Sequence, residues 1–151
     1  MKHEDWMRLA LDQAQKAYDC NEIPVGALVI VNQQILSVAF NEKEQKQDPT
    51  GHAEILAIRR AAEAMGHWRL TDATLYVTLE PCPMCAGAIL QARLKHLVYG
   101  ATDAKGGAVE SVMNVLNRNC WNHKVEVTAG VLEEECSVLL KQYFREKRTK
   151  A

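Results

Sequence analysis

The first third of the chain shows two hydrophobic patterns, first the spacing of a helix and then the apolar runs of strands. Apolar residues recur every three or four positions over residues 3–20, and this spacing predicts an amphipathic helix. Two nearly continuous apolar runs, 25–31 and 35–40, come next, and the polar residues 32–34 between them predict a β-hairpin. Residues 41–51 are polar and end in a turn signature, so we expect a loop there.

Helical and strand-like segments alternate after residue 51. Helices are predicted at 52–65, which Gly66 closes, and at 82–92, which has Pro83 in its first turn. The other predicted elements are strands at 74–79, 97–101 and 125–128, a loop at 103–107, a short helix around 111–116 and a last helix at 133–148. A hairpin followed by alternating strands and helices predicts an α/β fold, namely a three-layer α/β/α sandwich with a mixed five-stranded sheet and helices on both faces.

The size of the chain is that of one domain, and its composition indicates a folded core. It has 151 residues, of which 48% are apolar, and it contains no repeat, low-complexity tract or linker. We therefore expect a single domain over residues 1–151. No run of about 18 apolar residues is present, and the charged start of the chain does not resemble a signal peptide. We expect a cytoplasmic protein with no membrane partner.

The charge of the chain is small but uneven. A net charge of −1 excludes a strongly basic surface over the whole molecule. Residues 141–151 nevertheless hold five basic residues and one acidic residue, a net charge of +4, which leaves −5 for the rest of the chain. Such a run usually forms the solvated end of a helix, where it suits the helix dipole. It would also suit a polyanionic partner.

The five cysteines do not indicate a disulfide framework, because their number is odd and the expected compartment is reducing. Cys82 and Cys85 have the Cys-x-x-Cys spacing of a metal or redox site. Cys20, Cys120 and Cys136 stand apart from this pair, and we expect them to be small residues of the core.

Two predicted helices begin with residues that bind metals. His52 opens one of them, and Cys82 and Cys85 open another. Two thiolates and an imidazole are good zinc ligands, and three protein ligands with one open position are the arrangement of a catalytic zinc site. The helix dipole and the unpaired amides at a helix start favour the thiolate form. Glu54, in the first turn after His52, can reach a water at the open position and move its protons.

A Cys-x-x-Cys pair has two other interpretations. A redox pair would leave the sequence His52-Ala53-Glu54 unexplained. A structural zinc site needs a fourth cysteine or histidine. The remaining candidates, none of which is paired at ligand spacing, are Cys20, Cys120, Cys136, His67 and His123. The two matching halves of the motif favour the catalytic site.

The sequence His52-Ala53-Glu54 followed by Pro81-Cys82-Pro83-Met84-Cys85 resembles the signature of the zinc-dependent nucleoside and nucleobase deaminases. Within this superfamily the chain resembles the bacterial tRNA-specific adenosine deaminases over essentially its whole length. The segments that carry this resemblance are 22–27, 41, 48–50, 78–80, 86–89, 99–107, 122–123, 130–132 and 143–145. The chain departs from the family pattern at Gly51, Thr102 and Glu110.

The resemblance implies a cytidine-deaminase-like fold and the hydrolytic deamination of adenosine to inosine at the wobble position of a tRNA anticodon, with an arginine tRNA as the expected substrate. His52, Cys82 and Cys85 match the ligands of one Zn²⁺ per subunit, and Glu54 matches the catalytic proton shuttle. The activated water would attack C6 of the adenine and release ammonia. The resemblance also implies a homodimer whose active sites draw on both subunits.

Eight positions match residues that contact the substrate in this family. Ile23 and Pro81 match residues that pack near the flipped base, and Asn41 matches an asparagine that hydrogen-bonds the target nucleotide. The resemblance also implies that the backbone of Ala53 faces the base edge. Asp103 and Lys105 match a loop on the anticodon backbone, and Phe144 and Arg145 match a C-terminal helix that touches neighbouring nucleotides. By residue type alone, Asn41 is more commonly a turn residue, and 105–107 is equally explained as a flexible loop.

Three functions compete for this sequence. The first is the tRNA deaminase, with the anticodon stem-loop as partner. The second is a deaminase of a free nucleobase or nucleoside such as guanine, cytosine or cytidine, which needs the same metal site but no RNA-binding surface. The basic C-terminal helix and the loop at 102–107 favour the first. The third, a non-enzymatic zinc-binding module, does not account for Glu54. An anticodon loop also suits the chemistry, because its bases leave the stack at little cost.

Overall fold

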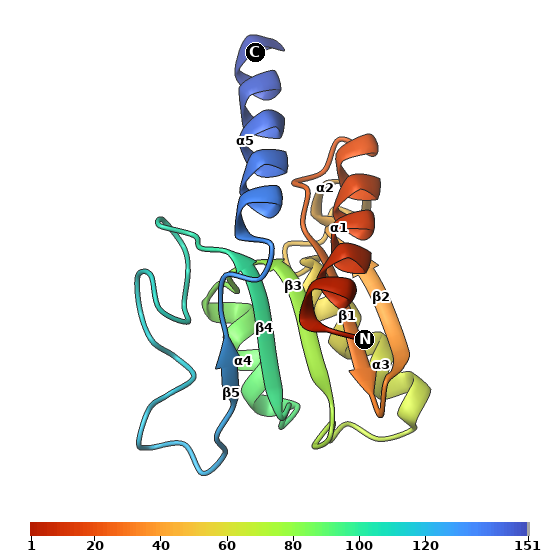
Figure 1. Ribbon diagram of the computed structural model, residues 1–151, viewed down its shortest axis with the longest axis vertical. Helices are drawn as coiled ribbons and strands as arrows, with labels where there is room; N and C mark the ends of the chain where they lie inside the picture. Colours follow the sequence, from red (N-terminus) through yellow and green to blue (C-terminus); the bar gives the residue numbers. More distant parts are fainter. Residues whose placement is uncertain (151) are drawn as a thin grey trace.

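Five strands form one mixed sheet between two layers of helices (Figure 1). The structure, a computed structural model, describes residues 1–150, and Ala151, the last residue of the predicted domain, lies outside them. The strands are β1 (Gly26–Val31), β2 (Gln34–Phe40), β3 (Thr74–Leu79), β4 (His96–Ala101) and β5 (Glu126–Thr128). The helices are α1 (His3–Asp19), α2 (Lys43–Lys46), α3 (Ala53–Met65), α4 (Pro83–Gln91) and α5 (Glu133–Lys150).

The strand order places the carboxyl ends of the parallel strands at one edge of the sheet. The order is β2-β1-β3-β4-β5, with β1 antiparallel to both β2 and β3, and with β3, β4 and β5 parallel. The residues that follow β3 therefore lie beside the end of β4, where the amide of Glu80 donates to the carbonyl of Ala101 at 2.8 Å. The predicted mixed five-stranded sheet is confirmed.

The predicted hairpin is also confirmed, with a tighter turn than expected. Asn32 and Gln33 both have positive φ, at 52° and 62°. This is the conformation of a two-residue hairpin turn whose twist matches that of the flanking strands. β2 consequently begins at Gln34, one residue before the predicted boundary.

The helices cover both faces of the sheet, as predicted. In Figure 1, α1 lies in front of the strands, α3 and α4 lie behind them, and α5 rises from the upper end of the sheet, above β4. The buried face of α1 consists of Trp6, Met7, Ala10, Gln13, Ala14 and Ala17. Small residues on this face let α1 approach the backbone of β1 closely, because a Cβ at Gly26 would lie 2.5 Å from the amide nitrogen of Ala14. Among the described residues, no helix is long and apolar enough to cross a membrane.

The segment expected to be a loop at 41–51 contains one helical turn, α2. The carboxylate of Glu22, which is fully buried, accepts hydrogen bonds from the amides of Glu44 at 3.1 Å and Gln45 at 2.6 Å. These are amides of the first turn, which have no partner within the helix. The turn is thus stabilised by a residue about 20 positions away in sequence, which a local pattern does not reveal.

The short helix predicted around 111–116 is wrong. Residues 108–112 form turns and a bend, 113–115 have no regular structure, and 116–117 form another turn. The amides of Val109, Glu110 and Ser111 all donate to the carboxylate of Glu80, and Val115 donates back to the carbonyl of Ala108 at 2.9 Å. In a helix over 111–116 the amide of Val115 would donate to the carbonyl of Ser111, so its bond to Ala108 is incompatible with the predicted helix.

The expectation that three cysteines are small core residues is correct for one of them. Cys136 is buried on α5 under β4, where its Sγ fits against Gly100. Cys20 and Cys120 are exposed. Both lie in turns that follow or connect regular elements, so residue type alone did not predict their exposure.

We predict that Gly26→Ala destabilises the protein by about 3 kcal/mol, because the added methyl group meets the backbone of α1 and one of the two elements must move. Gly106→Ala is the matched control, since a Cβ there makes only ordinary contact with the side chain of Asp103, at 3.4 Å. Urea unfolding at neutral pH measures both. Equal stability of the two variants would contradict the close packing of α1 on β1.

Candidate metal and active site

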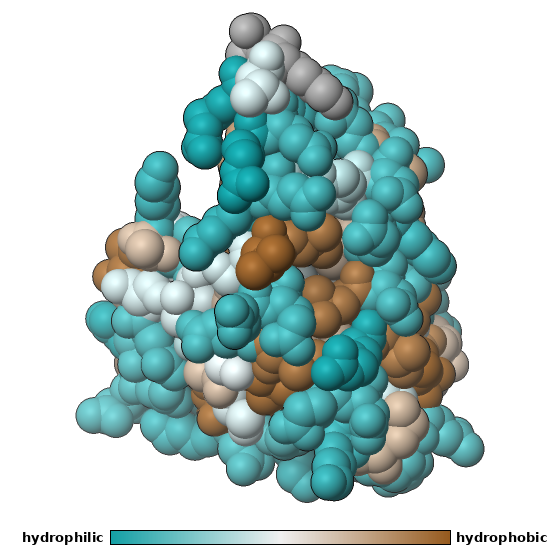
Figure 2. Space-filling view, turned by 45° about the horizontal axis from the view of Figure 1, so that its top comes forward, coloured by the Kyte–Doolittle hydropathy of each residue, from teal (hydrophilic) through white to brown (hydrophobic). Residues whose placement is uncertain are grey.

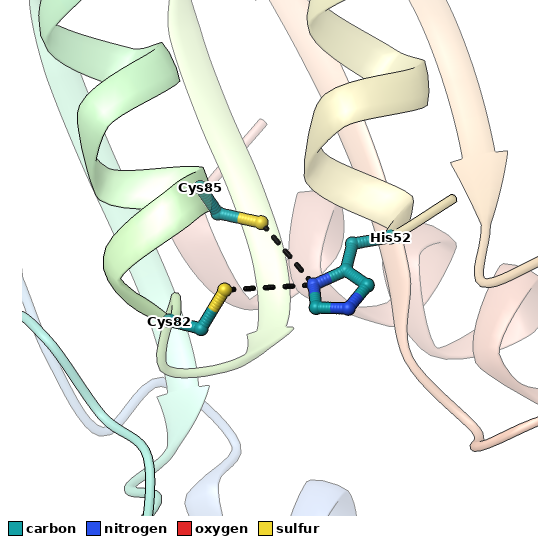
Figure 3. A group of neighbouring side chains, drawn as sticks. All are labelled: His52, Cys82 and Cys85. Atoms are coloured by element: carbon teal, nitrogen blue, oxygen red, sulfur yellow. Dashed lines mark hydrogen bonds between the residues drawn. The ribbon is translucent and has the colours of Figure 1, made fainter. Parts of the chain in front are cut away.

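Three side chains of metal-binding type meet where α3 and α4 begin (Figure 3). His52 is the residue that precedes α3, Cys82 precedes α4, and Cys85 lies in the first turn of α4. The Nδ1 atom of His52 lies 3.5 Å from the Sγ atom of Cys82 and 3.5 Å from that of Cys85. The structure thus brings together the three residues that the sequence predicted as ligands. We call His52, Cys82 and Cys85 the metal group.

The spacing of these atoms fits a tetrahedral metal ion. Ligands at the usual zinc distances of about 2.3 Å for sulfur and about 2.0 Å for nitrogen, at a tetrahedral angle, lie about 3.5 Å apart. This is the separation observed between Nδ1 and each Sγ. All three ligand atoms lie within 4.8 Å of one another, and the group can therefore hold one ion and leave its fourth position open.

The local sequence explains why these side chains point at one another. His52 and Cys82 both have the extended backbone typical of a residue that precedes a helix, and neither side chain caps its own helix. Pro83, at the first position of α4, has no amide hydrogen to satisfy, so this helix start tolerates a cysteine in the capping position. Both side chains are thus free for an ion.

The pKa values of the two thiols are shifted in opposite directions. A hydrogen bond from Cys85, together with one from His52, lowers the pKa of Cys82 to about 4. The same hydrogen bond with Cys82, burial and the nearby charge of Glu54 raise the pKa of Cys85. A cation between the two sulfur atoms would favour the thiolate form of both.

Glu54 lies beside this group in the first turn of α3, and it is 4% exposed. Burial raises the pKa of its carboxyl to about 7, although a backbone hydrogen bond and the charge of His52 oppose the shift. A carboxyl with a pKa near neutrality can both accept and donate a proton at the pH of the cell. Glu54 is the residue that the sequence predicts as the proton shuttle.

Two of the predicted substrate contacts are chain neighbours of the metal ligands, and two others lie before β1 and after β2. Ala53 is fully buried between His52 and Glu54, and Pro81 is buried directly before Cys82. Ile23 is half-buried. Asn41, at the end of β2, is 5% exposed, and its Nδ2 lies 3.4 Å from the carboxylate of Glu22. The structure therefore places polar Asn41 in a buried position with a specific partner, unlike an ordinary turn residue.

The other four predicted contacts lie on a loop and a helix. Asp103 uses its Oδ1 atom to accept the amides of Lys105 and Gly106, both at 3.1 Å, so its side chain shapes its own loop. The Lys105 side chain is exposed. On α5, Phe144 is 42% exposed and Arg145 is exposed, and the neighbouring Tyr143 donates from its hydroxyl to the carbonyl of Asn21 at 3.2 Å.

A separate groove of about 670 Å³ runs between α1 and α5. It is lined by Leu11, Asp12, Gln15, Glu134, Glu135, Val138, Leu139 and Gln142. Figure 2 shows hydrophobic side chains exposed in patches below the tip of α5, with hydrophilic side chains around them. The groove contains none of the metal-binding residues and none of the predicted substrate contacts.

Sequence reasoning did not single out two buried carboxylates, Glu22 and Glu80. Glu80 is 2% exposed and accepts four amides, from Asp103 at 3.0 Å and from residues 109–111 at 2.8–3.1 Å, together with the hydroxyl of Ser111. Burial alone would raise the pKa of Glu80, but these hydrogen bonds lower it to about 2. The available signal was an acidic residue between the apolar strand 74–79 and Pro81.

Comparison with known proteins agrees with the fold and the site. The family profile described as MafB19-like deaminase matches residues 1–148. The chain is 48% identical to the tRNA-specific adenosine deaminase of Bacillus subtilis over 147 residues, which are 97% of this chain and 91% of that protein. It is also 48% identical to the tRNA-specific adenosine deaminase of Haemophilus influenzae, over 96% of this chain and 84% of that protein.

Solved structures give the same result. A structure from a study of A-to-I editing by tRNA:A34 deaminases superposes with a TM-score of 0.87 at 43% identity, over 90% of this chain and 99% of that one. The guanine deaminase of Bacillus subtilis superposes with a TM-score of 0.66 at 30% identity, over 97% and 95%. Fold and metal group together define a deaminase of the cytidine-deaminase-like class. The sequence relatives narrow this further: the chain belongs to the family of tRNA-specific adenosine deaminases, as the sequence predicted.

We predict that the stability difference between wild type and Glu80→Gln depends on pH. The native pKa of Glu80, about 2, is below its ordinary value of 4.5, so the ionised carboxylate stabilises the native state above pH 4.5 and this contribution is lost as the pH falls toward 2. Wild type should exceed the variant by about 2 kcal/mol at pH 7, with a smaller gap at pH 3.5. Urea unfolding at several pH values measures it, and a constant gap would contradict the ionised state.

Proposed function

We propose that this protein hydrolyses the exocyclic amine of adenosine at the wobble position of a tRNA anticodon, giving inosine and ammonia, and that an arginine tRNA is its substrate. The observation that carries the proposal is the buried carboxyl of Glu54 beside the His52, Cys82 and Cys85 group. The 48% identity to tRNA-specific adenosine deaminases supports the choice of substrate.

The metal we propose is Zn²⁺, one per subunit, because two thiolates and one imidazole in tetrahedral spacing suit it. When bound, Zn²⁺ acts as a Lewis acid that makes a water a good nucleophile near neutral pH. His52, Cys82 and Cys85 hold the ion. Glu54 accepts the first proton of the attacking water and donates it to N1 of the adenine ring; it then accepts the proton of the hydroxyl added at C6 and donates that proton to the leaving amine.

The residues around the metal group would receive a base that has left its stack. Ile23 and Pro81 offer apolar surface to the base, and the backbone of Ala53 faces its edge. Because the Nδ2 of Asn41 is directed to Glu22, its Oδ1 is the atom available to accept a hydrogen bond from the nucleotide. A flipped base is recognised by such hydrogen bonds along its edge.

The loop after β4 and the helix α5 would bind the RNA outside the reacting base. The exposed side chain of Lys105 would contact the phosphate backbone beside the loop that Asp103 shapes. Phe144 offers an exposed aromatic face for stacking on a neighbouring base, and Arg145 next to it carries a positive charge. The excess of basic residues after residue 140 supports this assignment.

We also propose that residues 1–151 form one deaminase domain, that two copies form a homodimer whose active sites draw on both subunits, and that the protein acts in the cytoplasm, where its tRNA substrate is found. The outer side of α4 supports the dimer. Gly87 and Ala88 make this side flat, and a Cβ at Gly87 meets nothing within 4 Å, so a second chain could approach it closely.

We predict that Glu54→Gln lowers the rate of inosine formation by about a factor of 1,000 or more while the zinc content stays at one ion per chain, because Gln keeps the shape of the side chain but cannot accept a proton. Glu63→Gln, an exposed position on the same helix, is the control and should retain wild-type activity. Inosine is measured by sequencing of the reacted tRNA and metal by elemental analysis. Full activity of Glu54→Gln would overturn the assigned role.

We predict that a transcribed arginine tRNA with adenosine at the wobble position is deaminated, whereas free adenosine, guanine and cytidine are not. The expected reason is that the loop and α5 contacts are made only by the anticodon stem-loop. Activity on guanine without activity on the tRNA would replace the proposal by the free-base alternative, which the similarity to a guanine deaminase supports. A zinc-loaded protein with no activity on any of the four substrates would overturn both enzymatic proposals.

A further inference from the structure

Two buried glutamates, Glu22 and Glu80, have no role in the proposed reaction. Glu22 is fully buried and Glu80 is 2% exposed. Within the described part of the chain, neither carboxylate forms an ion pair with a lysine or arginine. A buried carboxylate without a cation is costly unless several donors satisfy it, so each site must offer such donors.

The carboxylate of Glu80 accepts hydrogen bonds from two parts of one loop. Its Oε1 accepts the amide of Asp103 and the hydroxyl of Ser111, and its Oε2 accepts the amides of residues 109–111. The two ends of the segment that carries Asp103 and Lys105 are thereby tied to one side chain. Gly107 makes room for it, since a Cβ there would lie 2.5 Å from Oε2 of Glu80.

The carboxylate of Glu22 accepts hydrogen bonds from the segment that follows β2. Its Oε1 accepts the amide of Glu44 and the Nδ2 of Asn41, and its Oε2 accepts the amide of Gln45. This fixes both the first turn of α2 and the orientation of the Asn41 amide group. An unrestrained asparagine at a strand end could present either its oxygen or its nitrogen to a ligand.

Backbone hydrogen bonds connect each segment to the residue that precedes a metal ligand. Glu80 is two residues before Cys82, and the amide of Ala108 donates to the carbonyl of Pro81 at 2.8 Å. On the other side, the amide of Glu42 donates to the carbonyl of Gly51, the residue before His52, at 2.9 Å. Each glutamate therefore fixes a segment relative to a metal ligand.

We propose that Glu22 and Glu80 are positioning residues of the nucleotide site, which hold Asn41 and the loop 103–111 in the geometry that receives the tRNA. The inference rests on the proposed function. Glu80 acts on the segment assigned to the RNA backbone, so its loss weakens substrate binding. Glu22 acts on the residue assigned to the reacting nucleotide, so its loss slows the reaction of bound substrate.

The first test is kinetic and compares Glu80→Gln with Glu22→Gln on the tRNA. We expect Glu80→Gln to raise KM about tenfold with kcat within about threefold of wild type, and Glu22→Gln to lower kcat about tenfold. Both variants keep one zinc per chain. Ser111→Ala, which removes one of the five hydrogen bonds to Glu80, should give a smaller rise in KM. Unchanged constants in both glutamate variants would overturn the proposal.

The second test uses double variants and so separates positioning from a general loss of stability. Gly107→Ala displaces the Glu80 carboxylate, so Gly107→Ala added to Glu80→Ala should cost nothing more in kcat/KM. Likewise, Glu22→Gln added to Asn41→Ala should cost nothing more than Asn41→Ala alone. Additive losses in both pairs would overturn the proposal, because they would mean that each glutamate acts independently of the group it contacts.

A readout that needs no tRNA keeps this inference distinct from the proposed function. Hydrogen exchange of the amides of residues 109–111 should be at least tenfold faster in Glu80→Gln than in wild type, with the control Glu63→Gln unchanged. If wild type deaminates no tRNA, the proposed function fails, while faster exchange still supports the restraint by Glu80. Unchanged exchange in Glu80→Gln overturns the restraint whatever the substrate.

Discussion

The site depends on two helices that begin at the same edge of the sheet and bring the Nδ1 atom of His52 to 3.5 Å from the Sγ atoms of Cys82 and Cys85. The imidazole of His52 comes from the start of α3 and the two thiols come from the start of α4, so the packing of these helices on the sheet sets the distances between the ligand atoms. Small buried residues permit this packing: Ala53, Ala57 and Ala61 on α3, and Ala86 on α4. The hydroxyl of Ser37 on β2 also donates to the carbonyl of Ala57, which links α3 to the sheet.

Two buried carboxyl groups have pKa values shifted in opposite directions because their surroundings differ. Glu54 and Glu80 are both almost inaccessible to solvent, yet the pKa of Glu54 is raised to about 7 and that of Glu80 is lowered to about 2. The difference follows from the number of donors, because Glu80 accepts four amides and a hydroxyl whereas burial dominates at Glu54. A group like Glu54 can exchange protons near neutral pH, and a group like Glu80 remains an ionised anchor.

The part of this structure that could be predicted from sequence is the part with local signals. Periodicity, the glycine and proline stops and the motif around His52 and Cys82 act within a few residues, and they predicted the strands, the long helices and the ligands. The helical turn α2 and the turns in place of a helix at 111–116 depend on Glu22 and Glu80, which are about 20 to 30 residues distant from the amides they bind. A carboxylate that satisfies a remote loop leaves no periodic pattern, so neither the loop nor the role of the glutamate could be predicted.

Structural relatives of this chain with the same fold include a tRNA:A34 deaminase and a guanine deaminase. The structural match extends to a guanine deaminase at 30% identity, while the match to the tRNA:A34 deaminase is closer, at 43% identity and a TM-score of 0.87. In the proposed reaction the metal group and Glu54 act on a C–N bond that any aminopurine offers, so they would not distinguish a free base from an anticodon. Discrimination must come from groups that contact the rest of the substrate. In this chain the proposed contacts lie on α5 and on segments that donate hydrogen bonds to Glu22 and Glu80, so a small number of buried hydrogen bonds would connect substrate choice to the position of the metal ligands.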